Sequence, residues 1–253
     1  IFGPALGGVL AAIALKLPAF VAGGIALGNT LLGYFTLPES LKTRRAEPIR
    51  ASDLNPIEQL GSLFAKPQLR FLLIGYFIFF LSFTGFTNNF SVYVRDRFAW
   101  GPPNIAGILL VVGIVSSIVQ GGLIRKLVPR FGETRLAIAG LSTVAIALTL
   151  VALSPVGWYL YGIQSLFALG VGMASPSLRG AIANAVSDTE QGAASGGSQS
   201  LGSLTQILGP FFAGLLYDNL GATVPIWMGA GLTVVAIAAI AQNATKSRTA
   251  SPI

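Results

Sequence analysis

The sequence of 253 residues contains 53% hydrophobic and 10% charged residues and has a mean hydropathy of +0.73, which excludes an ordinary soluble domain. It contains neither cysteine nor histidine, which excludes disulfides, thiol nucleophiles, imidazole bases and Cys/His metal sites, and we expect no metal or cofactor. The net charge of +7 does not indicate nucleic-acid binding, because the cations gather in a few loops between apolar segments, as in membrane proteins.

The chain begins inside an apolar segment. Residues 1–15 predict one spanning helix that lacks its start, and a second is expected at about 18–37. No Met, basic stretch or cleavage site introduces them, so this start does not read as a signal peptide. We therefore expect the chain to be a fragment of a longer protein.

The longest polar stretch, residues 38–69, is the expected boundary between two helical bundles. Within it, Asn55 is a candidate helix cap, Pro56 suits the first helical position, and Glu58 follows in the first turn. Three apolar residues then share one face: Leu60, Leu63 and Phe64. This pattern predicts a short amphipathic helix that lies on the membrane surface.

Six further apolar segments follow, at about 70–94, 104–124, 136–153, 157–180, 193–216 and 222–242. Each is close to or above the roughly 20 residues that cross the hydrocarbon layer. The predicted fold is an all-α membrane protein with a helical bundle, and eight spanning helices are present. Its parts are the end of a first bundle (1–37), the connecting loop (38–69), a six-helix bundle (70–243) and a tail (244–253).

The positive charges predict the orientation of these spans. Of the 16 Lys and Arg residues, 13 fall on one side, with Arg179 counted at the end of segment 157–180. By the positive-inside rule, we expect the long loop and the C-terminal tail in the cytoplasm. All nine acidic residues fall in loops or at helix ends, so we expect any proton-carrying carboxylate in the missing N-terminal part.

A Gly-Pro pattern occurs twice inside apolar segments, 206 residues apart. The two copies are Gly3, Pro4, Gly7 and Gly8, and Gly209, Pro210, Ala213 and Gly214. Proline kinks a helix, and small residues four apart let a neighbouring helix approach. Helix contact alone is one interpretation. The matched pair favours kinked helices that close one face of a transporter built from two parallel halves, with twelve helices in the intact protein.

The polar segment from 122 to 135 is a second candidate site. It is predicted as a short turn and contains Gly122, Arg125, Lys126, Arg130, Gly132, Glu133 and Arg135. A cluster of positive charge that sets the topology is the simpler interpretation. The glycine at each end and the single acid among arginines also suit a turn in which ion pairs latch a cytoplasmic gate.

Aromatic and amide side chains suggest a binding cavity. Phe79, Phe83, Phe86 and Phe90 share one face of segment 70–94, for which exposure to lipid is the default interpretation and a cavity wall the alternative. Nearby amides favour the cavity, because burying an amide without a partner costs about 2 kcal/mol or more. Gln120, Gln164 and Gln206 either link helices or line a cavity. The candidate cavity residues are Phe86, Asn88, Asn89, Gln120 and Gln164.

Taken together, these motifs resemble the major facilitator superfamily, and within it the drug:proton antiporters of the tetracycline-efflux type. The first Gly-Pro pattern is similar to the antiporter motif of the fifth helix, and residues 37–41 to the end of the sixth. Residues 120–135 are similar to the eighth helix and a degenerate gating loop, which has Leu-Val-Pro-Arg where the family often carries Asp. Residues 176–210 are similar to the tenth and eleventh helices.

The resemblance implies a multi-pass transporter of the bacterial inner membrane that exports small, drug-like amphiphiles by proton antiport and alternating access. The expected partners are a small-molecule substrate, protons and the lipid bilayer, with no nucleic acid, and the protein is expected to be a monomer and not an enzyme. Two alternatives stay open. One is a metabolite importer or facilitator with the same fold, and the other is a membrane scaffold or sensor that transports nothing.

Overall fold

The computed structural model describes residues 10, 14, 16–36 and 56–249. The chain divides into two compact units, residues 1–48 and 49–253, and each is described by itself. In the first unit, α2 (Leu17–Thr36) is the predicted second span. Most of the predicted helix at 1–15, including Gly3, Pro4, Gly7 and Gly8, lies outside the described residues.

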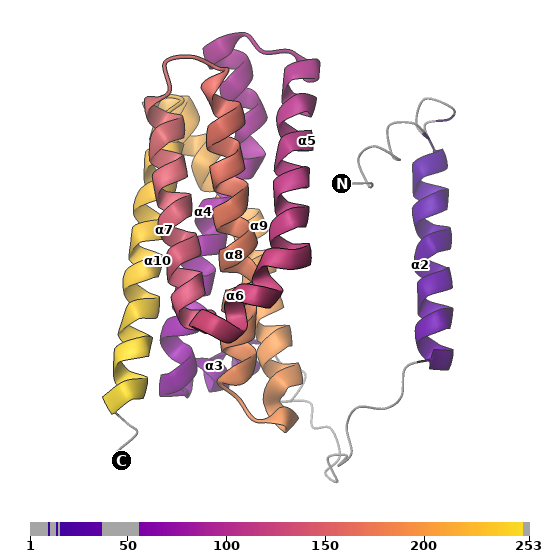
Figure 1. Ribbon diagram of the computed structural model, residues 1–253, viewed down its shortest axis with the longest axis vertical. Helices are drawn as coiled ribbons and strands as arrows, with labels where there is room; N and C mark the ends of the chain where they lie inside the picture. Colours follow the sequence, from indigo (N-terminus) through magenta and orange to yellow (C-terminus); the bar gives the residue numbers. More distant parts are fainter. Residues whose placement is uncertain (1–9, 11–13, 15, 37–55, 250–253) are drawn as a thin grey trace. The chain divides into compact units, whose positions relative to one another are not determined.

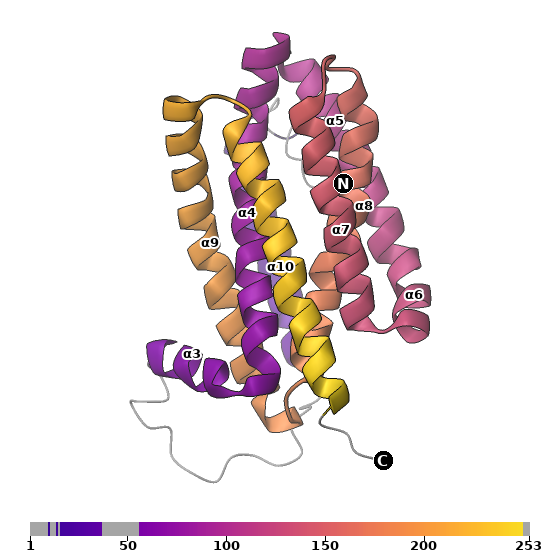
Figure 2. The ribbon, with the colours of Figure 1, turned by 90° about the vertical axis from the view of Figure 1, so that its left-hand side faces the viewer.

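The second unit is a bundle of long helices that run alternately up and down (Figure 1). Its helices are α3 (Pro56–Ala65), α4 (Pro67–Phe98), α5 (Pro102–Ile118), α6 (Ile124–Phe131), α7 (Glu133–Leu153), α8 (Tyr159–Asn184), α9 (Gln191–Leu220) and α10 (Val224–Thr249). Two short elements join them, the π-helical turn η2 (Val119–Leu123) and the 3-10 turn η3 (Asp188–Glu190). Figure 2 shows α3 lying across one end of the bundle.

Six helical segments of the described chain are long and apolar enough to cross a membrane. They are α2, α4, the continuous stretch Pro102–Phe131, α7, α8 and the Val224–Gln242 part of α10. Although α9 has 30 residues, it is not among them, since its first half is rich in Gly, Ser and Gln. The six predicted segments between 70 and 242 are all helices, so the all-α prediction is confirmed.

The charged segment that was predicted as a turn is mostly helical. Helix α5 continues through η2 into α6, so Gly122 lies in the π-helical turn and Arg125 and Lys126 lie on a helix. The apolar side chains of α6 pack beside Met173 of α8, which stabilises an amphipathic helix here. Only Gly132, with a φ of +78°, interrupts the backbone before α7, and that conformation favours glycine. The prediction of a turn was therefore wrong for residues 125–131, whereas residues 122–124 are helical as the predicted segment 104–124 required.

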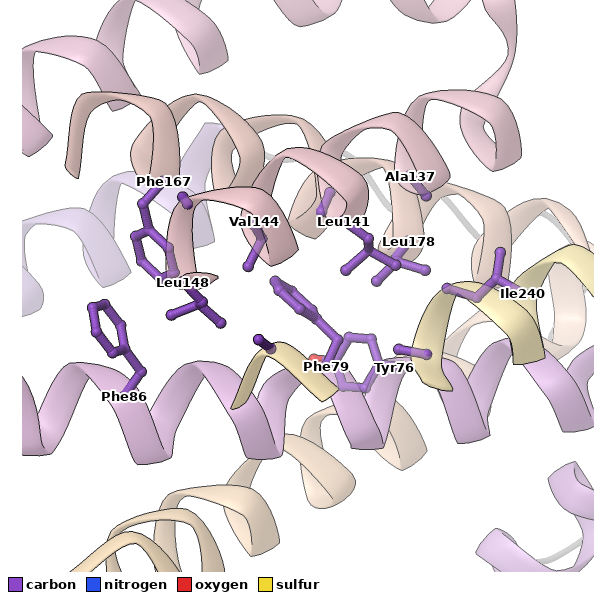
Figure 3. Packing of buried hydrophobic residues seen from close by; sticks show 14 of the residues in the cluster. Tyr76, Phe79, Phe86, Ala137, Leu141, Val144, Leu148, Phe167, Leu178 and Ile240 are labelled. Atoms are coloured by element: carbon purple, nitrogen blue, oxygen red, sulfur yellow. The ribbon is translucent and has the colours of Figure 1, made fainter. Parts of the chain in front are cut away.

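The core of the second unit shows that most of the phenylalanine stripe faces protein. Figure 3 shows Phe79 and Phe86 pointing from α4 toward Leu148 of α7 and Phe167 of α8. The Phe86 and Phe167 rings lie 4.9 Å apart, and Phe79 and Phe86 are 0% and 4% exposed. The Phe90 side chain is buried as well. Lipid exposure was therefore the wrong interpretation, because these rings pack among aliphatic and aromatic side chains of the same bundle.

Two glycines let α7 and α8 approach until their backbones touch. A Cβ atom added to Gly140 would lie 2.7 Å from the carbonyl oxygen of Gly170. One added to Gly170 would lie 2.8 Å from the carbonyl oxygen of Gly140. Since helices in lipid associate through close contact of small residues, this crossing holds the middle of the bundle together.

The predicted amphipathic helix forms as α3, but its apolar face packs on the bundle. Leu63 is 2% exposed and contacts Gly197 of α9. Leu60 and Phe64 are partly buried against the same core. Its leucines therefore face protein, and its position on the membrane surface stays a prediction.

An ion pair joins the α3–α4 junction to η3 and predicts a pH effect. Lys66 Nζ lies 2.5 Å from Glu190 Oε1, and Ser187 Oγ donates to Glu190 Oε2 at 3.1 Å. These bonds, chiefly the one from Lys66, hold the pKa of the Glu190 carboxyl below its ordinary 4.5. Because folding lowers this pKa, the stabilisation is complete above the ordinary value and is lost as pH falls through the folded-state value.

We expect Glu190→Gln to flatten the dependence of the thermal unfolding temperature on pH in the acidic range below the ordinary carboxyl pKa of 4.5. At neutral pH the loss of stability should be small, because the pair is partly exposed. The measurement is thermal unfolding in detergent over a pH series. Glu58→Gln, on the exposed side of α3, is the control and should leave the pH profile unchanged. An unchanged profile for Glu190→Gln would contradict the assignment.

Candidate functional site

A cavity of about 240 Å³ opens between α4, α8 and α9 of the second unit. Figure 2 shows α4 and α9 side by side, and in Figure 1 α8 runs next to α9. The lining residues are Tyr76, Phe80, Phe83, Thr84, Thr87 and Asn88 of α4, Arg179 of α8, and Gln199, Gly202 and Gln206 of α9. On both α4 and α9 they recur every three or four residues, which places them on one face of each helix.

Aromatic rings form one wall of this cavity. The rings of Tyr76 and Phe80 lie 4.4 Å apart, and the ring of Phe83 stacks on Phe167 at 6.1 Å with an interplanar angle of 4°. Phe167 belongs to the buried core, so it holds Phe83 in place from behind. Such a wall presents flat apolar surfaces to a bound ring system.

Hydroxyl and amide groups form the other wall. Thr84 Oγ1 donates to the carbonyl oxygen of Thr205 at 2.7 Å and so links α4 to α9 at the cavity. Asn88 Nδ2 donates to the carbonyl oxygen of Thr84 at 2.9 Å. The side chains of Gln199 and Gln206 are exposed on α9, where they can donate and accept hydrogen bonds.

Arg179 contributes a positive charge to the cavity. Its guanidinium carbon lies 6.0 Å from the centre of the Phe80 ring, within the range of a cation–π interaction. Within the part of the chain that the structure describes, no carboxylate lines this cavity. The sequence had placed Arg179 among the charges at the cytoplasmic end of segment 157–180. In the structure α8 continues to Asn184, so Arg179 lies more than one turn inside the helix.

Of the five candidate cavity residues, only Asn88 lines this cavity. Phe86 and Asn89 line a second cavity of about 10 Å³ beside Tyr217 of α9, which has room for about one water molecule. Gln164 is 4% exposed inside the bundle, and within the described chain its buried Oε1 has no hydrogen-bond partner. Gln120 is exposed in η2 and lines neither cavity. These side chains project at different angles around their helices, so the structure does not bring them together.

Sequence reasoning missed the aromatic face that lines the cavity. Tyr76, Phe80, Phe83 and Thr87 recur at i, i+4, i+7 and i+11, the same spacing as the phenylalanine stripe but rotated around α4. Only Phe83 belongs to both faces. The signal that separates the faces is polarity, since the cavity face also carries two threonines and Asn88.

The second Gly-Pro pattern lies beside the cavity, at the contact between α4 and α9. A Cβ atom added to Gly209 would meet Thr84 Oγ1 and would lie 2.8 Å from the backbone nitrogen of Gly85. Pro210 has no N–H to donate to the carbonyl of Gln206, which relaxes α9 where that side chain lines the cavity. Around Gly214, in contrast, an added Cβ would meet no atom within 4 Å. Gly209 thus acts within its own bundle, and a role in closing the transporter stays a prediction.

The predicted gating residues surround the α6–α7 junction. Glu133 Oε1 accepts a hydrogen bond from Asn184 Nδ2 at 2.9 Å, which joins the start of α7 to the end of α8. Within residues 56–249, no salt bridge links Glu133 to an arginine. The basic residues of this segment are exposed: Arg125, Lys126, Arg130 and Arg135. The latch at this junction therefore stays a prediction.

Comparison with known proteins identifies the family to which this fold belongs. The model of the Major Facilitator Superfamily matches residues 1–131 and 126–252. The chain belongs to the major facilitator superfamily. As a member of this superfamily, it is a multi-pass integral membrane protein, and the predicted fold class is confirmed.

Several relatives within the superfamily carry resistance names. The chain is 32% identical to the tetracycline resistance protein, class C, of Escherichia coli, over 98% of this chain and 63% of that protein. It is 30% identical to the tetracycline resistance protein, class G, of Vibrio anguillarum, over 90% of this chain and 57% of that protein. It is 29% identical to multidrug resistance protein 2 of Bacillus subtilis, over 93% of this chain and 60% of that protein. The chain thus spans less than two thirds of the length of these relatives.

A solved structure agrees with this placement. The crystal structure of the human organic anion transporter MFSD10 (TETRAN) superposes with a TM-score of 0.82 and 22% sequence identity. The match covers 91% of this chain and 58% of that protein. At this identity the likeness shows the shared fold alone.

Proposed function

We propose that this protein is a secondary active transporter that exports small, drug-like amphiphiles in exchange for protons, by alternating access. The observation that carries the proposal is the cavity between α4, α8 and α9, with rings on one wall and amides on the other. The similarity to tetracycline and multidrug resistance proteins supports export of drugs. Aromatic surfaces bind apolar parts of a ligand through contacts that depend little on orientation, and amide side chains can rotate to form different hydrogen bonds. One cavity can therefore accept several compounds.

The bundle is built to move as one body in this mechanism. Buried residues of α4, α7, α8 and α10 share one core, and Thr84 bonds α9 to α4. Alternating access in this class is largely rigid-body rocking of one bundle against another around a fixed site. The cavity would then face each side of the membrane in turn, and the tight crossing at Gly140 and Gly170 would keep its walls together.

The charges support a cytoplasmic position for α3 and the C-terminal end of α10. In Figure 1 these elements lie at the same end of the bundle as α6, whose basic residues include Arg125 and Arg130. Arg95 and Arg97 lie at the last turn of α4, at the other end. The larger positive charge belongs on the cytoplasmic side. Among the described residues no acid lines the cavity, so the proton-carrying carboxylate that this proposal requires is expected outside them.

The test is transport by the protein expressed from its complete reading frame and reconstituted into proteoliposomes. A pH gradient should drive movement of tetracycline or ethidium above the level of empty liposomes, and a protonophore should abolish it. Movement that ignores the gradient would favour the facilitator alternative. No movement of either compound would contradict drug export.

We expect Gln206→Leu to raise the KM for the transported compound roughly tenfold, since it removes hydrogen bonds worth about 1 kcal/mol or slightly more at the cavity wall. Gln120→Leu is the matched control, because this exposed glutamine of η2 lies outside the cavity, and its KM should not change. Equal effects of the two substitutions would show that the α4–α8–α9 cavity is not where the substrate binds.

A further inference from the structure

We propose that this cavity selects aromatic organic anions, and that Arg179 is the residue that binds the negative group. The proposal rests on the proposed export function, of which it names the substrate class. A carboxylate, enolate or sulfonate joined to a ring system fits the chemistry of the lining. The ring would lie against the aromatic wall, and the anionic group would meet the guanidinium.

The position of Arg179 sets it apart from the other cations at this end of the bundle. Arg125, Lys126 and Arg130 are exposed on α6, away from the cavity, where they suit a topological role. Arg179 is exposed as well, but it lies five residues before the end of α8 (Tyr159–Asn184) and lines the cavity with Tyr76 and Phe80. A charge at the end of a span needs no cavity around it, so topology alone does not explain this placement.

The surroundings of Arg179 orient it for an anion. Its guanidinium sits over the Phe80 ring at 6.0 Å, and Phe80 is supported by Tyr76 at 4.4 Å. The Tyr76 side chain hydrogen-bonds Arg179, and the guanidinium has five N–H donors, so donors remain for an incoming ligand. The guanidinium is a planar fork, which matches a carboxylate or sulfonate with two parallel hydrogen bonds.

The charge of Arg179 has no carboxylate partner in the described bundle. Its neighbours in the cavity are hydroxyl, amide and aromatic groups. The bonded acids have partners elsewhere: Glu190 bonds Lys66, Asp96 bonds Arg95 and Tyr217, and Glu133 bonds Asn184. An anion that enters the cavity can pair with Arg179, so it gains a charge-assisted hydrogen bond that a neutral analogue lacks.

The remaining lining fixes the other end of such a ligand. Phe83 is held flat by its stacking on Phe167, and Gln199 and Gln206 face the cavity from α9. A ligand with an acid at one end and ring substituents at the other can contact Arg179 and these amides together. A phospholipid headgroup shares the anionic chemistry but has no ring to place on the aromatic wall.

The experiment measures binding in the absence of any gradient. The protein from the complete reading frame, purified in detergent, is dialysed to equilibrium with 2-naphthoate, 2-naphthamide or cyclohexanecarboxylate against protein-free micelles. In the wild type, 2-naphthoate should bind about tenfold more tightly than 2-naphthamide, as expected for one charge-assisted hydrogen-bonded pair. Cyclohexanecarboxylate should bind more weakly than 2-naphthoate, because it lacks the flat ring.

Three variants assign the effect to Arg179. Arg179→Gln should abolish the preference for 2-naphthoate while 2-naphthamide still binds, which also shows that the variant is folded. Arg179→Lys should keep part of the preference. Arg70→Gln removes the same charge at an exposed position outside the cavity and should change nothing.

The outcomes separate this proposal from the export function. Equal binding of the two naphthalene compounds, or a preference that survives Arg179→Gln, would overturn the anion site even if drug export is observed. A lipid headgroup site would give two results: phosphatidylglycerol but not phosphatidylcholine would displace 2-naphthoate, and cyclohexanecarboxylate would bind as tightly as 2-naphthoate. These results would also overturn the site for aromatic anions. Arg179-dependent binding without any proton-driven transport would uphold the site and refute export.

Discussion

Gly170→Val is expected to prevent stable folding of the second unit. The first atom of the new side chain would lie 2.8 Å from the carbonyl oxygen of Gly140 and 2.9 Å from the backbone nitrogen of Val144. Both are backbone atoms of α7, so the clash is relieved only if α7 and α8 separate. Since α7 and α8 both contribute to the central core, we expect a loss of about 3 kcal/mol or more.

The measurement is the yield of monodisperse protein in detergent, together with its thermal unfolding temperature. Gly162→Val is a matched control in the same helix, because no atom lies within 4 Å of a Cβ added there. The control should be neutral or slightly stabilising, because valine favours the helix slightly more than glycine does. Similar behaviour of the two variants would contradict the close crossing of α7 and α8.

Gly209→Ala is expected to weaken the contact between α4 and α9 by about 2 kcal/mol. The added methyl group would meet Thr84 Oγ1 and would lie 2.8 Å from the backbone nitrogen of Gly85. Because Thr84 and Gln206 both line the cavity near this contact, a shift of α9 should also reduce transport. Thermal unfolding in detergent and transport in proteoliposomes measure the two effects.

Two further variants test the cause of this loss. Gly214→Ala, where an added Cβ meets no atom within 4 Å, should be neutral or slightly stabilising, because alanine favours the helix. Thr84→Ala in the Gly209→Ala background should restore part of the stability, because it removes the oxygen that the methyl group meets. A double-mutant cycle with no coupling would show that the two side chains do not clash.

The family resemblance and the helical segments were predictable from the sequence. A span needs roughly 20 mostly apolar residues, and the run of such segments from 70 to 242 marks the long helices in order. Part of the cavity was predictable too, since Asn88 and Gln206 are amides at depth that require polar surroundings. The other residues that line the cavity were not predictable, because they come from three helices that are far apart in the chain.

The rotation of each helix was decided by the tertiary structure. In a soluble protein the apolar face of a helix points inward, but in a membrane both lipid and core are apolar, so hydrophobicity does not separate the inner face from the outer one. This is why the stripe of Phe79 and Phe86 was expected to face lipid and instead packs against Phe167. The adjacent face of α4, with Tyr76 and Phe80, lines the cavity.

The sequence also predicted where the helical segments lie in the chain, but not what surrounds a given position on a helix. Apolar length and charge by themselves determined an all-α membrane bundle, because these properties are local and the bilayer imposes them on each segment. The family was indicated by the resemblance of the motifs. Only the tertiary structure showed that α8 continues past Arg179 and that this charge lies over Phe80. The contact depends on how α4 and α8 pack against each other, and no local property of either segment records it.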